Sequence, residues 1–545
     1  MSEALRAELM RVASRLGADG IDFVLERPRD AGHGDLATNL AMVLAKRERA
    51  NPRKTAERVL QEIHLPPELI EKTEIAGPGF INFWLAGDQL AALHQRILTQ
   101  GTSYGRSSSG EGLSVNVEFV SANPTGPLHV GHGRQAALGD AIAALLNWTG
   151  HRVTREFYYN DAGVQIANLA ASVQARVREA VGEPLVLPEG GYHGEYIKEI
   201  ADTYRREFPD DPRADQIDQV RRLAIRELRR EQDLDLKALG VTFDVYYLES
   251  SLYEEGKVDA VVGALTQRGK TYENEGALWL RTTAFGDDKD RVMRKSDGTF
   301  TYFVPDVAYH VNKWERGFRQ AINVQGADHH STVTRVRAGL QALEMGVPPG
   351  YPEYVLHQMV TVMRRGEEVK ISKRAGSYVT VRDLIDDVGA DAVRYFFLMR
   401  KRDSHLVFDV DLAREQSEKN PVFYVQMAHA RLSGIFRTAD RPPDSVVGAL
   451  DLTALPASQD TELLKKLAEF PEVTAAAARE REPHRVTAYL HELATSVHGW
   501  YHHTRAVGAP EGEATERARL LLARSARIVL ANGLHLLGIS APDRM

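Results

Sequence analysis

One stretch, residues 113–150, restricts the fold of this chain more than any other. Apolar and polar residues alternate over 113–119, which is the period of a strand with one buried face. The sequence NPTGP at 123–127 then interrupts regular structure, and after it apolar residues recur at helical spacing as far as Gly150. The stretch therefore predicts a strand, a glycine-rich turn and a helix, in that order.

Two histidines lie in this turn, His129 and His132. They stand at positions i and i+3, so their imidazoles share one face if the helix has already begun. A helix N-terminus presents unpaired N–H groups, and Gly131 and Gly133 have no side chain to keep a phosphate away from that backbone. We therefore predict a polyphosphate site here. The residues alone leave a second interpretation open, a pair of helix-capping histidines.

A short basic segment, EVKISKRAG at residues 368–376, is the second signal. Lys370, Lys373 and Arg374 flank Ser372 and form a compact group of cations that can act as point charges on phosphate. On its own such a segment is equally typical of a solvated basic loop. The HVGH and KISKR sequences together, however, resemble the HIGH and KMSKS motifs of class I aminoacyl-tRNA synthetases.

Three further stretches narrow the resemblance. VEFVSANPTGPL at 117–128, YNDAG at 159–163 and SAPDRM at 540–545 are similar to the bacterial arginyl-tRNA synthetases, and the resemblance covers nearly the whole chain. It implies a HIGH-like motif made of Ala122, Asn123, Pro124, Thr125, Gly126, Pro127, Leu128, His129, Val130, Gly131 and His132.

The resemblance implies an α/β chain with a class I Rossmann-type catalytic domain, an α+β N-terminal domain and an all-α C-terminal anticodon-binding domain. We place the N-terminal domain at 1–105, ending in the linker-like run 101–110, the catalytic domain at 106–402 and the anticodon-binding domain at 403–545. Helical periodicity over about 170–290 predicts a helical insertion in the catalytic domain. Helical patterns in the C-terminal domain cover 421–431, 463–478, 483–501 and 517–537.

The implied activity is the ligation of L-arginine to tRNA(Arg), by ATP-dependent formation of arginyl-adenylate and transfer to the terminal ribose. His129, His132, Lys370 and Lys373 would be catalytic, because they would stabilise phosphate charge as the carboxylate attacks. ATP would be bound by these residues together with Gly131, Gly133 and Ser372, and Mg²⁺ would sit on the leaving group. No general base is needed, since the attacking carboxylate is already ionised.

Arginine recognition is expected from Tyr302 and Asp306, which stand at i and i+4 where a helix begins. A guanidinium needs a carboxylate for charge and a planar partner for orientation, and in the family residues at these positions contact it. Without the family, a helix-capping Asp beside a core Tyr is the simpler interpretation.

Three other residues are implied in arginine binding. Glu118 and Asn123 match family residues that hold polar groups of the amino acid. The role of Gln325 stays open, because Ala327 stands where some relatives carry a substrate-binding Gln. The neighbouring run 328–330, Asp-His-His, is expected to pack or cap a helix, and we expect no metal site.

Two regions bear on RNA. The basic run 46–54 has the pattern of a solvated helix face, although the family's N-terminal domain touches the corner of the tRNA. Tyr501, His502 and His503 can stack on unpaired bases or be buried helix neighbours. The net charge of −7 argues against a broadly polycationic protein, but local patches decide affinity for a phosphate backbone.

The amino-acid composition limits the kinds of site and the cellular location that we expect. There is no cysteine, which excludes disulfides and thiolate zinc sites, and no apolar run is long enough to span a bilayer. We expect a cytoplasmic monomer without membrane contact. The rival functions are a small HxGH nucleotidylyltransferase, which needs no long helical C-terminal domain, and a catalytically silent RNA-binding relative, which needs neither both histidines nor both lysines.

Overall fold

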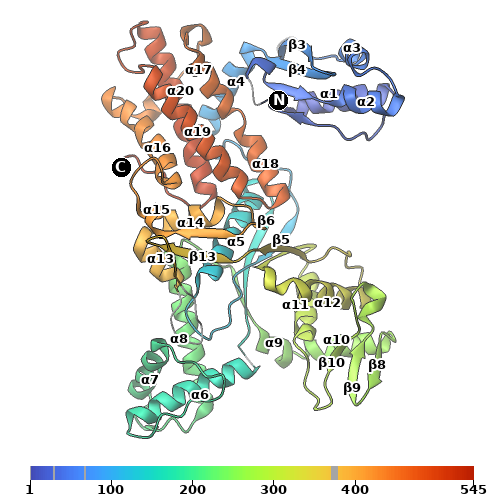
Figure 1. Cartoon of the computed structure of the whole chain (residues 1–545), viewed down its shortest axis with the longest axis vertical. Coiled ribbons are helices and arrows are strands. Elements are labelled where there is room, and N and C mark those ends of the chain that lie inside the picture. Colours follow the sequence, from blue (N-terminus) through green and yellow to red (C-terminus); the bar gives the residue numbers. More distant parts are fainter. Residues whose placement is uncertain (1, 29–30, 67–68, 162, 370–378) are drawn as a thin grey trace.

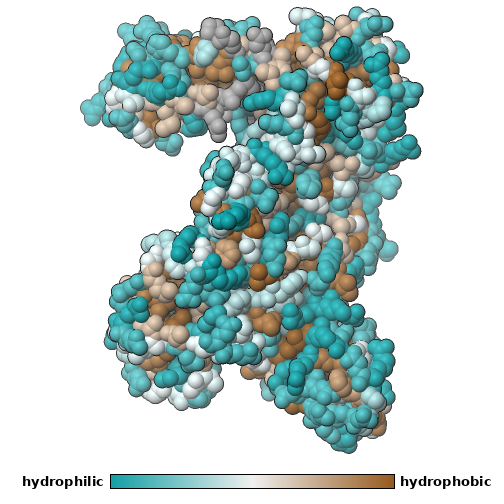
Figure 2. All heavy atoms as spheres, turned by 180° about the vertical axis from the view of Figure 1, so that it is seen from behind, coloured by the Kyte–Doolittle hydropathy of each residue, from teal (hydrophilic) through white to brown (hydrophobic). Residues whose placement is uncertain are grey.

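The computed structural model describes residues 2–28, 31–66, 69–161, 163–369 and 379–545. The molecule is elongated (Figure 1): an N-terminal unit lies beside the C-terminal helices, a parallel sheet lies below them, and two lobes extend from the other end. Figure 2 shows from behind how the N-terminal unit projects sideways, and how hydrophilic residues cover much of both lobes. None of the helices in the described part of the chain combines the length and apolarity that a membrane crossing requires.

The central sheet has five parallel strands in the order β12-β11-β5-β6-β7. The strands are β5 Ser114–Glu118, β6 Arg152–Tyr159, β7 Val245–Leu248, β11 Gln320–Gly326 and β12 Glu353–His357. The chain moves from β5 to β6 on one side and returns later to the other side of β5 with β11. In sheets of this kind, ligands bind outside the carboxyl ends of the strands where the order reverses. That point lies where β5 and β11 end.

The predicted strand is confirmed as β5, but the prediction of a single buried face is wrong. Asn116 and Glu118, on the polar side of the alternation, are both buried. Asn116 Nδ2 donates to Glu156 Oε2 at 3.0 Å, and Glu118 Oε2 accepts from Lys313 Nζ at 2.6 Å. Polar residues can fill this second face because they satisfy one another's hydrogen bonds inside the protein.

The predicted helix is confirmed as α5, Val130–Trp148. It lies very close to β5, because a Cβ added at Gly139 would be 2.1 Å from the Phe119 side chain. Gly150 follows the helix with a φ of 91°, which favours glycine.

The predicted helical insertion at about 170–290 is only partly right. Helices α6 Gly163–Ala180, α7 Glu195–Glu207 and α8 Ile217–Ala238 form one lobe around their own apolar core. β7 then returns to the central sheet, so the helical lobe ends before it. β7 has only four residues, two of them tyrosines. Such a short segment shows no clear alternation of apolar and polar residues, so the sequence does not reveal it.

The second lobe follows β7 and contains α9 Glu249–Glu254, α10 Lys257–Gln267 and the antiparallel sheet of β8 Thr271–Asn274, β9 Ala277–Leu280 and β10 Arg291–Arg294. Helices α11 Phe303–Glu315 and α12 His330–Ala342 pack against each other and lead back to the central sheet.

A small sheet connects the catalytic part to the C-terminal helices. It consists of β14 Glu367–Glu368, β13 Val360–Arg364 and β15 Leu406–Asp409, and β13 and β15 run parallel. Helices α13 Val381–Val388, α14 Ala390–Leu398 and α15 Val410–Arg414 surround it. The KISKR sequence falls between β14 and α13, at 370–378, and lies outside the described residues.

The C-terminal part is all-helical, with α16 Pro421–Thr438, α17 Ser458–Leu467, α18 Phe470–Glu480, α19 His484–His503 and α20 Glu513–Leu536. The continuous helical pattern at 463–478 is wrong, because the structure divides it between α17 and α18. Pro471 explains the break: it has no N–H to donate, so it is accommodated in the first turn of a new helix.

Helix α4, Gly87–Gln100, lies before the predicted domain limit at 105 but packs against the central and C-terminal parts of the chain. Leu90, Leu93 and Ile97 are buried in the core that α5 and α20 share, and His94 Nδ1 hydrogen-bonds with Ser525 Oγ at 2.9 Å. The linker-like run is also packed, since Tyr104 is buried and its hydroxyl donates to the Leu467 carbonyl at 3.2 Å. An amphipathic pattern shows that a helix has a buried face but not what covers it.

The N-terminal unit is α+β, as predicted. It contains α1 Ser2–Arg15, α2 Leu40–Glu48, α3 Pro52–Glu62 and the antiparallel sheet β1-β2-β4-β3, with β1 Leu25–Glu26, β2 Leu36–Thr38, β3 Ile70–Ala76 and β4 Phe80–Leu85. The unit has its own apolar core. The cations of the basic run 46–54 are exposed, as a solvated helix face requires, and they are also accessible to RNA.

Candidate active site

The two histidines lie at the N-terminus of α5, directly after the carboxyl end of β5. Their rings stack with centroids 3.7 Å apart and an interplanar angle of 20°. His129 Nδ1 accepts from the N–H groups of Gly131 at 3.1 Å and His132 at 3.4 Å, while His132 Nδ1 accepts from the His129 N–H at 3.4 Å. The helix-capping interpretation is therefore confirmed, and the imidazoles also point together as the phosphate interpretation predicts.

This geometry corrects how a phosphate can be bound. The N–H groups of Gly131 and His132 already donate to His129, and that of Gly133 donates to the His129 carbonyl at 3.1 Å. Because Nδ1 of each ring is the acceptor, the proton of the neutral imidazole is on Nε2. The groups suited to a phosphate oxygen are the two Nε2–H donors.

Gly133 has a packing role that the sequence does not show. It is buried, and a Cβ there would be 2.9 Å from both Phe397 and Val381. Its missing side chain allows α5 to approach α13 and α14, so the prediction that it exposes backbone to ATP is not supported.

The segment that follows KISKR is tied to the histidines. Thr380 forms a β-bridge with His129, and the Val381 N–H donates to the Leu128 carbonyl at 2.8 Å. Lys370, Ser372 and Lys373 themselves lie outside the described residues. The described chain therefore resumes after KISKR directly beside the N-terminus of α5.

The loop that forms the rest of the HIGH-like motif is held by the helical lobe. Gln232 Nε2 on α8 donates to the carbonyls of Asn123 at 3.1 Å and Gly126 at 2.9 Å. The Tyr196 hydroxyl on α7 donates to the Thr125 carbonyl at 2.9 Å. These contacts fix the loop between β5 and α5 through its main chain.

Two neighbouring carboxylates, Asp306 and Glu249, lie near Glu118 and Lys313, and we call this pair the acidic pocket. Asp306 on α11 is partly buried, and Glu249 at the start of α9 is buried and accepts from the Tyr158 hydroxyl at 2.9 Å. Within the described residues, neither carboxylate has an ion-pair partner. Two buried carboxylates without a cation are costly unless a cationic ligand joins them.

The ionisation of the pocket reflects this arrangement. Burial, and then the negative charges of Glu249 and Glu118, raise the pKa of Asp306 to about 7, although Lys313 acts in the opposite direction. Burial likewise raises the pKa of Glu249, with a smaller contribution from Asp161 and against the hydrogen bond from Tyr158. A bound cation would favour the ionised form of both groups.

Glu118 differs from these two carboxylates because its charge is already balanced. Oε2 accepts from the fully buried Lys313 at 2.6 Å, and Oε1 accepts from Ser121 Oγ at 2.9 Å. Lys313 Nζ also donates to Asn323 Oδ1 at 3.2 Å. Glu118 thus has little negative charge left over to pair with a guanidinium.

The other predicted arginine-binding residues border the same crevice. Tyr302 immediately precedes α11, and it is 77% exposed, so it is not the core Tyr of the simpler interpretation. Asn123 Nδ2 donates to Gln165 Oε1 at 2.7 Å. Gln325 lies near the carboxyl end of β11, and its buried Oε1 has no hydrogen-bond partner among the described residues, which leaves one acceptor for a ligand.

Glu249, Tyr158 and Lys313 are absent from the sequence-based prediction. Tyr158 lies near the end of β6. Of the three residues, it alone could have been proposed from the sequence, because it directly precedes the YNDAG stretch. Glu249 and Lys313 could not be found, because their importance depends on neighbours that are distant in the sequence.

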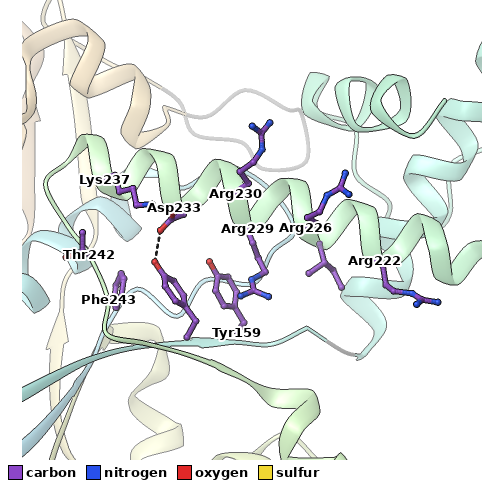
Figure 3. A pocket seen from close by; sticks show the side chains of 11 residues that line it. Tyr159, Arg222, Arg226, Arg229, Arg230, Asp233, Lys237, Thr242 and Phe243 are labelled. Atoms are coloured by element: carbon purple, nitrogen blue, oxygen red, sulfur yellow. Dashed lines mark hydrogen bonds and ion pairs between the residues drawn. The ribbon is translucent and has the colours of Figure 1, made fainter. Parts of the chain in front are cut away.

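A basic and aromatic groove of about 610 Å³ runs along α8 (Figure 3). Its lining includes the cations Arg222, Arg226, Arg229, Arg230 and Lys237 and the aromatic rings of Tyr159, Phe243 and Tyr246. The Arg229 guanidinium lies 4.6 Å from the centroid of the Tyr159 ring. Cations beside aromatic rings suit single-stranded nucleic acid, which offers phosphates and stackable bases. Tyr159 ends β6, so the groove adjoins the crevice.

The run 328–330 forms a short 3₁₀ turn, 327–329, and the first residue of α12. Asp328 and His329 are exposed and 3.7 Å apart (Oδ2 to Nε2). In the described part of the chain, no group of three His, Asp or Glu residues has a geometry that could hold a metal ion.

Three family models match the chain. Residues 1–85 match the arginyl tRNA synthetase N-terminal domain, residues 94–433 the catalytic domain of tRNA synthetases class I (R), and residues 425–545 the DALR anticodon binding domain. The first two models divide the chain near α4, in agreement with the packing of that helix.

Individual relatives match over the whole length. The chain is 55% identical to the arginine–tRNA ligase of Geobacter metallireducens and 54% identical to that of Geotalea uraniireducens, with 100% of each chain covered. The arginyl-tRNA synthetase structure of Thermus thermophilus is 24% identical and superposes with a TM-score of 0.79 over 100% of both chains, which shows a shared fold.

Proposed function

The chain belongs to the arginine–tRNA ligases, a family of class I aminoacyl-tRNA synthetases, and we propose how its residues divide the reaction between them. The enzyme ligates L-arginine to tRNA(Arg): arginine and ATP give arginyl-adenylate and pyrophosphate, and the arginyl group then moves to the terminal ribose. An aminoacylation assay with each standard amino acid and bulk tRNA tests this directly, and only arginine should be transferred.

The acidic pocket supports the choice of arginine. Among the described residues, Asp306 and Glu249 have no counter-ion, and the Tyr158 hydroxyl donates a hydrogen bond to Glu249. A guanidinium supplies a delocalised charge and several N–H donors, so one side chain can satisfy both carboxylates. Tyr302 would cover its planar face, and Asn123, Glu118 and Gln325 would hold the polar groups of the amino acid.

The phosphates of ATP would contact the other side of the crevice. His129 and His132 would donate Nε2–H to phosphate oxygens, and Ser372, Lys370 and Lys373 would approach from the KISKR segment. The charge on the phosphates grows as the arginine carboxylate attacks the α-phosphorus, and fixed donors stabilise that state most. Mg²⁺ would arrive with the nucleotide and neutralise charge on the leaving pyrophosphate.

We expect His132→Ala to slow adenylate formation about a hundredfold, roughly 3 kcal/mol, because a donor to phosphate charge is lost. Arginine affinity should hardly change. Pre-steady-state kinetics with saturating tRNA measure the rate of adenylate formation, and an arginine titration measures the affinity for arginine.

Two matched variants separate catalysis from helix capping. Asn at 132 can place an oxygen near the Nδ1 position and keep the cap, whereas Gln can place a donor near Nε2. His132→Asn should therefore recover the melting temperature but remain slow, and His132→Gln should recover part of the rate. A fast His132→Asn enzyme would assign His132 to the fold alone.

Arginine binding should depend on pH. With a pKa of about 7 for Asp306, the carboxyl group is mostly neutral near pH 6 and mostly ionised near pH 8. The affinity of the free enzyme for arginine should therefore rise about tenfold between about pH 6 and about pH 8, with release of a proton on binding. Calorimetric titration in buffers of different ionisation enthalpy measures both effects. A constant affinity over this range would contradict the assignment of Asp306.

Further assignments complete the proposal. The exposed basic run 46–54, the groove on α8 and the exposed Tyr501, His502 and His503 on α19 would contact tRNA(Arg). We divide the chain into an N-terminal unit ending near 86, a catalytic part that includes the small sheet, and an anticodon-binding part that shares its core with α4. The enzyme would act as a cytoplasmic monomer, and a sedimentation mass near 60.6 kDa would support this.

A further inference from the structure

Arg134 lies on α5, two positions after His132, and its side chain is fully buried. Nη1 donates to the carbonyls of Gln358 at 2.7 Å and Ser404 at 3.2 Å, and Nη2 donates to the Lys401 carbonyl at 3.0 Å. All three acceptors are main-chain oxygens. No carboxylate in the described part of the chain forms an ion pair with this guanidinium.

Burial of this guanidinium group lowers the stability of the folded protein. A buried cation loses its hydration, and hydrogen bonds to uncharged carbonyls offset the free-energy cost of this loss less completely than a carboxylate would. Burial accordingly lowers the pKa of Arg134 to about 10, against the charge of Asp403, so the group still carries its charge at neutral pH. Its Nε is buried and finds no hydrogen-bond partner in the part of the chain that the structure describes. Stability alone would favour an apolar side chain here, so a different role is indicated.

The three carbonyls show what Arg134 holds. Gln358 precedes β13, and Ser404 precedes β15, its parallel neighbour in the small sheet. β13 leads through β14 to residue 369, the last described residue before KISKR. One side chain of the histidine-bearing helix therefore clamps the start of β13, upstream of the KISKR segment, together with the start of β15, the parallel neighbour of β13 that comes later in the chain.

The downstream side is attached to the same helix. Thr380 bridges to His129, Val381 bonds to the Leu128 carbonyl, and Gly133 lets Val381 approach closely. Both flanks of the KISKR segment are thus fixed to the beginning of α5, upstream by Arg134 and downstream by main-chain contacts.

We propose that Arg134 is a positioning residue: it sets the separation between the imidazoles of His129 and His132 and the small sheet, whose strands β13 and β14 lead towards Lys370 and Lys373. The inference rests on the proposed assignment of these four residues to ATP. Two groups of cations that act on one triphosphate need a fixed separation, and a misplacement of about 1 Å can cost a factor on the order of a hundred in rate.

The test is Arg134→Lys, which keeps a cation but loses the planar fork that reaches three carbonyls. The matched control is Arg394→Lys. Arg394 on α14 is also fully buried, and it donates to the carbonyls of Leu537 at 2.7 Å and Leu239 at 3.1 Å and to Asp140 Oδ2 on α5 at 2.6 Å; none of these acceptors belongs to the small sheet. Aminoacylation kinetics with saturating tRNA(Arg) and the melting temperature are measured for both variants.

Both variants should melt earlier than the parent enzyme. Only Arg134→Lys should lower kcat by at least tenfold and raise the KM for ATP, while the KM for arginine stays within about twofold. Arg134→Met, which fills the volume without charge, provides the same comparison if the lysine variant does not fold.

Equal losses in the Arg134 and Arg394 variants, or an unchanged KM for ATP in a folded Arg134 variant, would overturn the proposal. His132→Asn separates it from the assignment on which it rests. A slow His132→Asn enzyme beside a normal Arg134→Lys enzyme means that only the positioning role fails. A normal His132→Asn enzyme means that the ATP assignment itself fails.

Discussion

Asp306→Asn should reduce kcat/KM for arginine by two to four orders of magnitude, because a buried guanidinium would lose its charged partner while the shape of the pocket is kept. Removing one member of a buried ion pair typically costs about 3–5 kcal/mol. Most of the loss should appear in arginine affinity. Steady-state aminoacylation with saturating ATP and tRNA measures it, and the pH dependence of arginine binding should disappear in the same variant.

Citrulline provides a sharper readout, because it replaces the guanidinium by a neutral urea group of the same shape. The parent enzyme should strongly prefer arginine over citrulline. Asp306→Asn should reduce the ratio of kcat/KM for arginine to that for citrulline, because its binding site no longer favours a positively charged side chain. Glu249→Gln should cause a similar but smaller change.

Glu118→Gln is the matched control, and it should act differently. It leaves Lys313 buried without its partner, so the melting temperature should fall more than the preference for arginine. If Asp306→Asn used arginine as well as the parent does, and Glu118→Gln lost the preference, Glu118 would be the guanidinium partner.

The parts of the fold that the sequence predicts are those encoded locally. β5, the turn and α5 follow from the periodicity of consecutive residues, and Pro and Gly mark their limits. The packing of α4 against α20 and the return of β7 to the central sheet depend on segments hundreds of residues away. Periodicity carries no information about such partners, so the sequence alone shows neither where α4 packs nor that β7 joins the central sheet.

The site shows the same division. His129 and His132 are predicted from a motif and Asp306 from its spacing to Tyr302 and the family resemblance, whereas Lys313 becomes meaningful only when α11 places it 2.6 Å from Glu118 on β5. The prediction of free N–H groups at the start of α5 failed for a related reason. The sequence shows that a helix begins at a histidine, but it does not show that the imidazole itself satisfies those groups.

The family resemblance also implies that tRNA must be bound before arginine is activated, and the structure offers a physical route. Asp391 at the start of α14 accepts from Gln426 Nε2 on α16 at 2.8 Å and from the Ser540 N–H at 3.1 Å, so the C-terminal helices hold α14. α13 directly precedes α14. Arg382 on α13 donates from Nε to Asp235 Oδ1 on α8 at 2.9 Å, so α13 is also attached to the helical lobe. Both predicted tRNA surfaces therefore bear on the helix that follows KISKR.

We expect exchange of labelled pyrophosphate into ATP to require arginine and tRNA(Arg) together, with no exchange above background when tRNA is omitted. Deleting 404–545 is an unsuitable test, because the C-terminal helices share one core with the central sheet and the remainder would expose it. Charge reversal on α8 keeps the chain intact. Arg222→Glu should raise the tRNA concentration for half-maximal exchange about tenfold or more, whereas Arg221→Glu, the same change outside the groove, should have little effect.

The two variants should differ in tRNA affinity but not in chemistry, because neither touches the crevice. At saturating tRNA, Arg222→Glu should therefore reach the exchange rate of the parent enzyme, which a damaged active site could not do. Full exchange with arginine and ATP alone would show that α13 is already positioned without tRNA, and the proposed coupling would be wrong. A nucleotidylyltransferase would also exchange without tRNA, and a silent relative would give no exchange under any condition, so tRNA-dependent exchange is the result that neither rival function gives.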